Sequence, residues 1–197
     1  MPTGIALRDA RTQLFEAAER VLLRDGPGGL TSRAVTAEAG VAKGVLHRHF
    51  ADFDGFLAEL VLDRIGEIRA SSAALRDSAG TGTVTGNLTI ALADLLESVC
   101  LALIGLVIAR DELRTRLRAA GAGRLPVAVE TSAMIATYLA AEREIGRVSP
   151  EADIDALAPT LTGAIHLLYA DRERRPASAD AVAAIVTTVI AGVVREP

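Results

Sequence analysis

Aromatic residues and cysteines are scarce in this chain of 197 residues. It contains no tryptophan, 3% aromatic residues and a single cysteine, Cys100, although half of its residues are hydrophobic. A core of this composition must consist mainly of Leu, Val, Ile and Ala, which suits helices that meet at small residues. One cysteine excludes an intramolecular disulfide framework and is typical of a reducing compartment.

Long hydrophobic runs are absent too. The most apolar run, residues 99–109, has about half the length of a membrane-spanning helix, and two carboxylates, Asp94 and Glu97, precede it. Residues 1–11 lack the apolar core of a signal peptide. We therefore expect a cytoplasmic protein with no membrane partner, in which residues 99–109 form a buried helix.

Patterns typical of enzymes and metalloproteins are also missing. The three histidines and Cys100 never have the spacing of paired metal ligands, and no glycine-rich loop follows a strand. Cys100 could act as a nucleophile with His166 as its base only in an electropositive, partly exposed setting, but its neighbours are apolar. The sequence predicts no catalytic residue, no metal and no cofactor, and hence a protein that is not an enzyme.

Hydrophobic periodicity predicts helices along the whole chain. In the first half we expect helices over residues 8–24, 31–39, 42–50 and 52–76, a glycine-proline break at 25–29 and a flexible loop at 78–86. In the second half we expect helices over residues 87–118, 126–147 and 178–195, the first with a possible break near residues 110–111. Another helix should begin at residues 149–151 and kink near Leu157, and a charged loop should follow at residues 171–176. The prediction is an all-α fold of about nine helices.

Residues 30–50 are the most informative stretch. Thr31 can cap a first helix with its side-chain oxygen, and Gly40 follows that helix where a positive φ is often required. A second helix from about Ala42 would bury Leu46 and Phe50, four residues apart. Its small and basic residues would then face outward, as in a helix-turn-helix motif whose second helix enters the DNA major groove.

This stretch resembles the TetR family, bacterial transcriptional regulators similar to the tetracycline repressor, over roughly residues 8–62. The matching positions are Thr31, Val35, Ala39, Gly40, Val41, Lys43, Gly44, Leu46, His49 and Phe50. The chain departs from the family pattern at His47 (usually tyrosine), Val45 (often threonine) and Phe53 (often a lysine that touches phosphate). An ordinary corner between two helices would leave the small and basic residues at 42–44 unexplained.

The charge distribution is compatible with a DNA partner, although the net charge is −4. Residues 1–50 hold seven basic and five acidic groups, and Lys43 is the only lysine of the chain. DNA affinity depends on a local cationic face more than on total charge. The expected DNA-binding residues are Thr31, Ser32, Arg33, Ala42, Lys43, Gly44, Val45, His47, Arg48 and His49.

The resemblance implies a three-helix DNA-binding head, residues 1–52, and a C-terminal helical bundle, residues 53–197, that binds a ligand and forms a homodimer. Isolated polar or soft side chains among aliphatic neighbours are candidate ligand contacts: Glu97, Cys100, Ile104, Met134, Tyr138, His166 and Tyr169. Small-residue faces on the last two helices are candidate dimer contacts: Ala156, Thr160, Gly163, Leu167, Ala181, Ala184 and Thr188.

The resemblance implies a ligand-responsive regulator, a repressor that binds a palindromic operator as a dimer and is released by a small apolar or weakly polar effector. An alternative from another class stays open: a helical small-molecule-binding or scaffold protein that has lost DNA binding. The acidic net charge and Phe53 favour that alternative, whereas Arg33, Lys43 and Arg48 oppose it.

Overall fold

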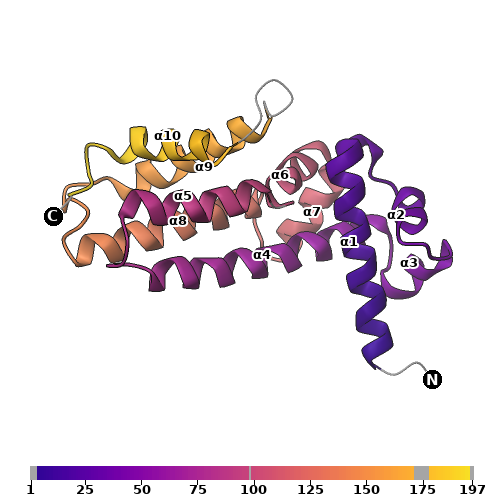
Figure 1. Ribbon diagram of the computed structural model, residues 1–197. Helices are drawn as coiled ribbons and strands as arrows, with labels where there is room; N and C mark the ends of the chain where they lie inside the picture. The colour runs from indigo at the N-terminus through magenta and orange to yellow at the C-terminus, as the bar shows by residue number, and fades with distance from the viewer. Residues whose placement is uncertain (1–3, 98, 171–177, 196–197) are drawn as a thin grey trace. The chain divides into compact units, whose positions relative to one another are not determined.

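The computed structural model describes residues 4–97, 99–170 and 178–195 (Figure 1). These residues form ten helices and one isolated antiparallel bridge between Val148 and Val194, which confirms the all-α prediction. The helices are α1 (Gly4–Gly29), α2 (Ser32–Glu38), α3 (Gly44–His49), α4 (Phe53–Asp77), α5 (Val84–Glu97), α6 (Cys100–Ala109), α7 (Asp111–Ala119), α8 (Pro126–Glu144), α9 (Ile154–Ala170) and α10 (Ala179–Ile190).

The chain divides into two compact units. The first comprises Met1–Asp63 and Ala102–Leu125, and the second comprises Arg64–Leu101 and Pro126–Pro197. Helix α4 contributes to both, since the division falls between Asp63 and Arg64. The compact units do not test the predicted division into a DNA-binding domain, residues 1–52, and a ligand-binding and dimerisation domain, residues 53–197, which stays a prediction.

The core of the first unit is built around all four phenylalanines of the chain. The Phe50 ring lies 5.8 Å from that of Phe15 and 4.9 Å from that of Phe56, and the Phe53 and Phe56 rings stack at 5.7 Å. These residues come from α1, the C-cap of α3 and the start of α4. Aromatic pairs at such distances add to ordinary apolar burial, so the cluster fixes α3 against α1 and α4.

The predicted break after the first helix is confirmed. Gly26 has φ +69° and interrupts the helical dihedral angles of α1, and Pro27 follows it. Glycine adopts this conformation without the steric cost that a Cβ would bring.

In the second unit four helices pack side by side: α8 on α9, α9 on α10, and α10 on α5. Each buries a stripe of aliphatic residues, for example Leu88 and Leu92 of α5 and Val182, Val186 and Ile190 of α10. Among the described residues no single helix is long and apolar enough to cross a bilayer, although the bent pair α5 and α6 together would be by length and composition.

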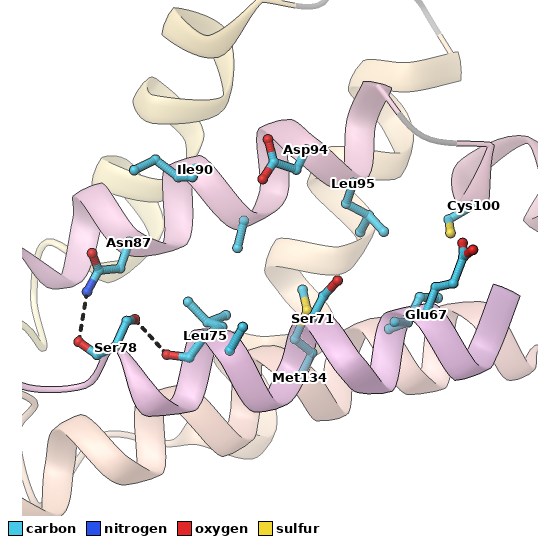
Figure 2. Close-up of a pocket in the computed structure, with 13 residues that line it drawn as sticks. Glu67, Ser71, Leu75, Ser78, Asn87, Ile90, Asp94, Leu95, Cys100 and Met134 are labelled. Carbon is cyan, nitrogen blue, oxygen red and sulfur yellow. Dashed lines mark hydrogen bonds between the residues drawn. The ribbon is translucent and has the colours of Figure 1, made fainter.

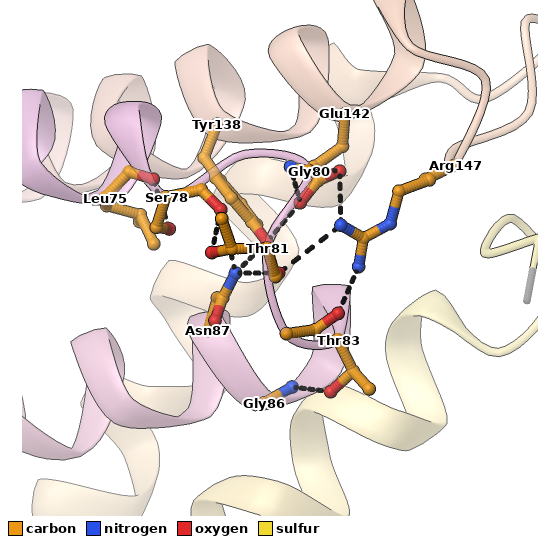
Figure 3. A network of polar contacts seen from close by, with 11 residues as sticks. Leu75, Ser78, Gly80, Thr81, Thr83, Gly86, Asn87, Tyr138, Glu142 and Arg147 are labelled. Carbon is orange, nitrogen blue, oxygen red and sulfur yellow. Dashed lines mark hydrogen bonds and ion pairs between the residues drawn. The ribbon is translucent and has the colours of Figure 1, made fainter.

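The segment expected to be a flexible loop is shorter than predicted and is held by polar contacts (Figure 3). Helix α5 already begins at Val84, and the preceding turn is bonded to distant residues. The Arg147 guanidinium donates to the carbonyl oxygens of Thr81 and Gly82 at 3.3 and 2.8 Å, and the Gly80 N–H donates to the Glu142 carboxylate at 3.3 Å. The prediction of a loop extending to Gly86 was wrong, because Thr83 Oγ1 caps α5 by accepting the Gly86 N–H at 3.0 Å. Partners more than 60 residues away hold the turn before this cap.

Glu142 and Tyr138 form the buried centre of these contacts. Both residues are fully buried. The Tyr138 hydroxyl donates to Glu142 Oε1 at 2.6 Å and accepts from Asn87 Nδ2 at 3.0 Å, and Arg147 Nη1 lies 3.5 Å from Glu142 Oε2. A buried carboxylate is costly unless donors and a cation surround it. Burial and the hydrogen bond to Glu142 raise the pKa of Tyr138 above its ordinary value.

Several helix boundaries differ from the sequence prediction, among them the end of α8 at Glu144 in place of residue 147. The stretch 87–118 forms α5, α6 and α7: the break at Arg110 was predicted, whereas the interruption after Glu97 was not. Helix α9 begins at Ile154 and α10 ends at Ile190, both short of the predicted limits. The Val148–Val194 bridge accounts for both limits, because the residues before α9 and after α10 pair with each other in an extended conformation. Beside the bridge, the Ser149 N–H donates to the Val193 carbonyl at 2.7 Å. Helix α9 is one element across Pro159, and the charged loop 171–176 lies outside the described residues.

The buried pair yields a test of stability. Tyr138→Phe removes a donor from a buried carboxylate and should lower the free energy of unfolding by about 1–3 kcal/mol at pH 7. Because the folded-state pKa of Tyr138 is raised, the unfolded tyrosine ionises first, and the parent should lose stability as pH rises above about 10. Urea unfolding at pH 7 and pH 10.5 should show a smaller alkaline loss in Tyr138→Phe than in the parent or in Tyr169→Phe. An equal loss in all three would contradict the assignment.

Candidate nucleic-acid interface and ligand cavity

Local contacts build the helix-turn-helix as the sequence predicted. Thr31 Oγ1 caps α2 by accepting the Ala34 N–H at 3.1 Å, and Gly40 ends that helix with φ +65°. Leu46 and Phe50 of the second helix are buried, with 0% and 3% of their surface exposed. Since α3 begins at Gly44 with Lys43 as its N-cap residue, it starts slightly later than expected.

The outward face of α3 carries the residues that the sequence assigned to it. Ala42, Lys43, Gly44, His47 and Arg48 are all exposed. The remaining two predicted contacts on this segment, Val45 and His49, are half-buried, and the His49 ring lies 6.4 Å from that of Phe50.

The start of α2 presents the other predicted contacts. Thr31 and Arg33 are exposed and Ser32 is half-buried. The Ser32 hydroxyl makes no hydrogen bond within the described residues.

The described basic residues of α1, α2 and α3 fall into two groups. Three arginines of α1 pair with carboxylates: Arg11 pairs with Glu59, and Arg20 and Arg24 each pair with Glu38 at 2.8 Å. The hydrogen bonds from Arg24 and Arg20 lower the pKa of Glu38 below its ordinary value.

The second group lies on α2 and α3. Within the described part of the chain, Arg33, Lys43 and Arg48 have no acidic partner within 4.0 Å. A cation without a carboxylate beside it keeps its full attraction for an anion. The positive charge of these three residues lies at the exposed face of α3 and at the start of α2.

Gly44 has no structural reason to be a glycine. A Cβ built there would meet no atom within 4 Å, and its φ is not in the left-handed region. Glycine lowers helix stability by up to about 1 kcal/mol relative to alanine. Its presence on the outward face is understandable if this face must lie close to another molecule.

The start of α4 is fixed by ion pairs. Asp52 Oδ1 caps the helix by accepting the Gly55 N–H at 2.8 Å, and Asp52 Oδ2 accepts from Arg116 Nη2 at 2.8 Å. The Gly55 N–H and the Arg116 charge lower the pKa of Asp52 below its ordinary value. Arg110 pairs with Asp54 at 2.9 Å and lies over the Phe53 ring. Phe53, which replaces the family's lysine, therefore serves packing.

The second unit contains a cavity of about 440 Å³ between α4 and α5 (Figure 2). This volume lies within the range of small-molecule sites. Its apolar lining includes five buried side chains, Ile68, Leu75, Leu95, Cys100 and Met134, and the exposed Ile90. Its polar lining residues are Glu67, Ser71, Ser78, Asn87 and Asp94.

Two of the seven sequence candidates for ligand contact, Cys100 and Met134, line this cavity. The other five do not line it. The Tyr138 hydroxyl is hydrogen-bonded to Glu142, and Ile104 is a buried core residue. Glu97 is exposed, and His166 and Tyr169 are half-buried on α9. No pattern in the sequence marked Glu67, Ser71 and Asp94 as lining residues, because polar residues on amphipathic helices are ordinarily solvated.

The predicted dimer faces are open in the single chain. Helices α9 and α10 pack together and expose most of the residues named for contact between subunits. Exposed are Ala156, Thr160, Gly163, Leu167, Ala184 and Thr188, and Ala181 is half-buried. Leu167 has 70% of its surface exposed, the largest value of any large hydrophobic residue in the described chain.

Comparison with known proteins agrees with the geometry of the head. Residues 14–60 match the family model of bacterial regulatory proteins, tetR family. The HTH-type transcriptional regulator PksA of Bacillus subtilis is 37% identical over 75 residues, which cover 34% of this chain and 37% of that protein. The chain thus matches little more than a third of this curated relative's length.

Solved structures share the whole fold. A TetR family transcriptional regulator from Agrobacterium tumefaciens has a TM-score of 0.74 at 15% identity, over 96% of this chain and all of that one. A regulator from Saccharomonospora viridis in complex with choline has a TM-score of 0.69 at 18% identity, over 96% of this chain and 100% of that one. At these identities the likeness concerns the fold.

The open space around Gly44 provides a test of the interface. Gly44→Leu should leave the free energy of unfolding unchanged or raised, but abolish binding to duplex DNA, because its side chain would hold α3 away from the phosphate backbone. Gly44→Ala is the matched control, which should be at least as stable and lose less affinity. Fluorescence anisotropy with DNA and thermal melts measure both quantities. Full DNA affinity in a folded Gly44→Leu protein would show that this face does not meet DNA.

Proposed function

This chain belongs to the TetR family of bacterial regulatory proteins, and we propose that it is a cytoplasmic repressor that binds a palindromic operator as a homodimer and is released by a small molecule. The observation that carries the proposal is the exposed face of α3, with Lys43, Gly44, His47 and Arg48 outward and its cations unpaired.

DNA binding by this face follows from charge and shape. Arg33, Lys43 and Arg48 would contact phosphates or base edges, and the small residues Ala42 and Gly44 would allow α3 to approach the duplex closely. Thr31, Ser32, Val45 and His49 complete the proposed contact surface. The acidic net charge of the chain is a weak argument against DNA binding, because DNA affinity depends on the local cationic face. The acidic group nearest in sequence to Arg33 and Lys43, Glu38, is already paired with Arg20 and Arg24.

Regulation by a ligand is supported by the cavity and by α4. Glu67, Ser71 and Leu75 line the cavity and belong to the same helix as Asp54, which Arg110 holds in the first unit. A ligand that favours one position of α4 would shift the population of DNA-binding conformations. Choline in the Saccharomonospora viridis regulator shows that this fold can hold a small molecule.

A homodimer would bury the exposed faces of α9 and α10. Small residues permit close approach of helices, and Leu167 adds an apolar side chain that is otherwise 70% exposed. A two-fold axis through these faces would pair each with its copy. Two heads at a fixed spacing could then read two half-sites about one turn of DNA apart.

We propose no catalytic role for this chain. The alternative, a small-molecule-binding or scaffold protein without DNA binding, would be favoured if the protein retained no fragment of its source genome at low salt. Sequencing retained fragments would otherwise identify the operator.

Lys43→Ala tests the recognition helix. Loss of a phosphate contact should lower affinity for every duplex and reduce the slope of log affinity against log salt by about one. Loss of a base contact should cost about 1–3 kcal/mol and relax one operator position. Thermal stability should not change, because Lys43 is exposed.

Arg118→Ala is the control for Lys43→Ala, since it removes one exposed positive charge from α7. It should retain both the affinity and the salt slope of the parent. If Lys43→Ala binds DNA as tightly as Arg118→Ala at every salt concentration, α3 is not the recognition helix.

Ala184→Arg tests the dimer. Two such cations would face each other across the proposed axis without acceptors, so light scattering should show monomers or aggregates, and specific DNA binding should be lost although the head is unchanged. Ala73→Arg, at an exposed position on α4, is the matched control and should remain a DNA-binding dimer. A dimeric, DNA-binding Ala184→Arg protein would place the interface elsewhere.

A further inference from the structure

The cavity between α4 and α5 has an asymmetric charge. Its lining includes two carboxylates, Glu67 of α4 and Asp94 of α5, and among the residues described as lining it there is no lysine, arginine or histidine. Figure 2 shows the two carboxylates on the two helices that wall the cavity. The remaining walls are largely aliphatic, together with the sulfur atoms of Cys100 and Met134.

Two of the three neutral polar side chains of this lining, Ser78 and Asn87, are already used by the fold, and the third is Ser71. The Ser78 hydroxyl donates to the Leu75 carbonyl at 2.6 Å. The Asn87 amide nitrogen lies within 3.0–3.3 Å of three acceptors, the Ser78 and Thr81 carbonyl oxygens and the Tyr138 hydroxyl. These contacts belong to the network in Figure 3, which orders the turn before α5. They leave few donors for a bound anion or carbonyl group.

The carboxylates differ in availability. Glu67 accepts from Arg64 Nη1 at 2.5 Å, which partly neutralises it, although 62% of the Glu67 side chain is exposed. Asp94 has no hydrogen bond or ion pair within the described residues, and it is exposed. The principal polar group that the cavity offers a ligand is thus a carboxylate beside an apolar wall.

We propose that this cavity binds an organic cation with an apolar body, its positive group at Asp94 and Glu67 and its body against Ile68, Leu75, Leu95 and Met134. An ammonium or guanidinium group would restore the charge balance of the lining, whereas a carboxylate or phosphate would be repelled by both acidic residues. A neutral ligand of the same shape would gain only the apolar contacts. The inference rests on the ligand-binding role proposed above and adds the chemical class of the ligand.

Three series of probes with the same alkyl tails of six to ten carbons test the proposal: alkyltrimethylammonium ions, primary alcohols and fatty carboxylates, all below their critical micelle concentrations. Calorimetry with the full-length protein in the absence of DNA should show that each cation binds more tightly than its alcohol, and that each carboxylate binds most weakly. Asp94→Asn should weaken binding of the cations about tenfold, the loss expected for one charge-assisted contact. The same substitution should leave binding of the alcohols unchanged.

Glu144→Gln, which removes an exposed carboxylate of α8 outside the cavity, is the control and should bind all probes as the parent does. Cations that bind no more tightly than their alcohols, or equally well to the parent and to Asp94→Asn, would overturn the proposal. DNA affinity is measured separately with and without the best cation. Selective cation binding that leaves DNA affinity unchanged would support the site and contradict only the release mechanism proposed above.

Discussion

The phenylalanine cluster of the first unit is the constraint on which the candidate interface depends. Helix α3 has six residues, too few to be stable alone. Its orientation is set where Phe50 meets Phe15 and Phe56, at 5.8 and 4.9 Å. Because Leu46 is buried on the same side of α3, the opposite side is left to solvent, and that side carries Lys43, Gly44 and Arg48. The aromatic contacts thus decide which residues α3 presents.

Ion pairs extend this constraint along α4. Arg110, the N-cap residue of α7, pairs with Asp54, and Arg116, in the last turn of α7, pairs with Asp52, so these ion pairs link the first turn of α4 to α7. The same helix contributes Glu67 and Leu75 to the cavity. A long helix that is anchored at its first turn and lines a cavity toward its other end is a physically simple element for coupling the proposed ligand site to the proposed DNA-binding face. The partly exposed pairs contribute positioning more than stability.

The parts of the fold that local sequence determines were predicted well. Thr31 caps α2, Gly40 has a positive φ, and the buried spacing of Leu46 and Phe50 is the spacing of one helical face. The parts that depend on distant partners were not. The limits of α9 and α10 follow from the pairing of Val148 with Val194, and the order of residues 78–83 follows from Glu142 and Arg147. The cavity is also a feature that depends on residues distant in the sequence, because Asp94 becomes a lining residue only when α5 lies near α4.

The net charge of −4 therefore conceals two sites of opposite sign. Arg33, Lys43 and Arg48, on α2 and at α3, have no acidic partner within the described residues, whereas two carboxylates line the cavity of the second unit, and one of them, Glu67, pairs with Arg64. The two sites share no residue, and a ligand suited to the carboxylates carries the same sign as the α3 face. Such a ligand has no electrostatic reason to occupy the proposed DNA-binding face. Any effect of it on DNA affinity must consequently pass through the structure, and α4 and α6 are helices that supply residues to both compact units.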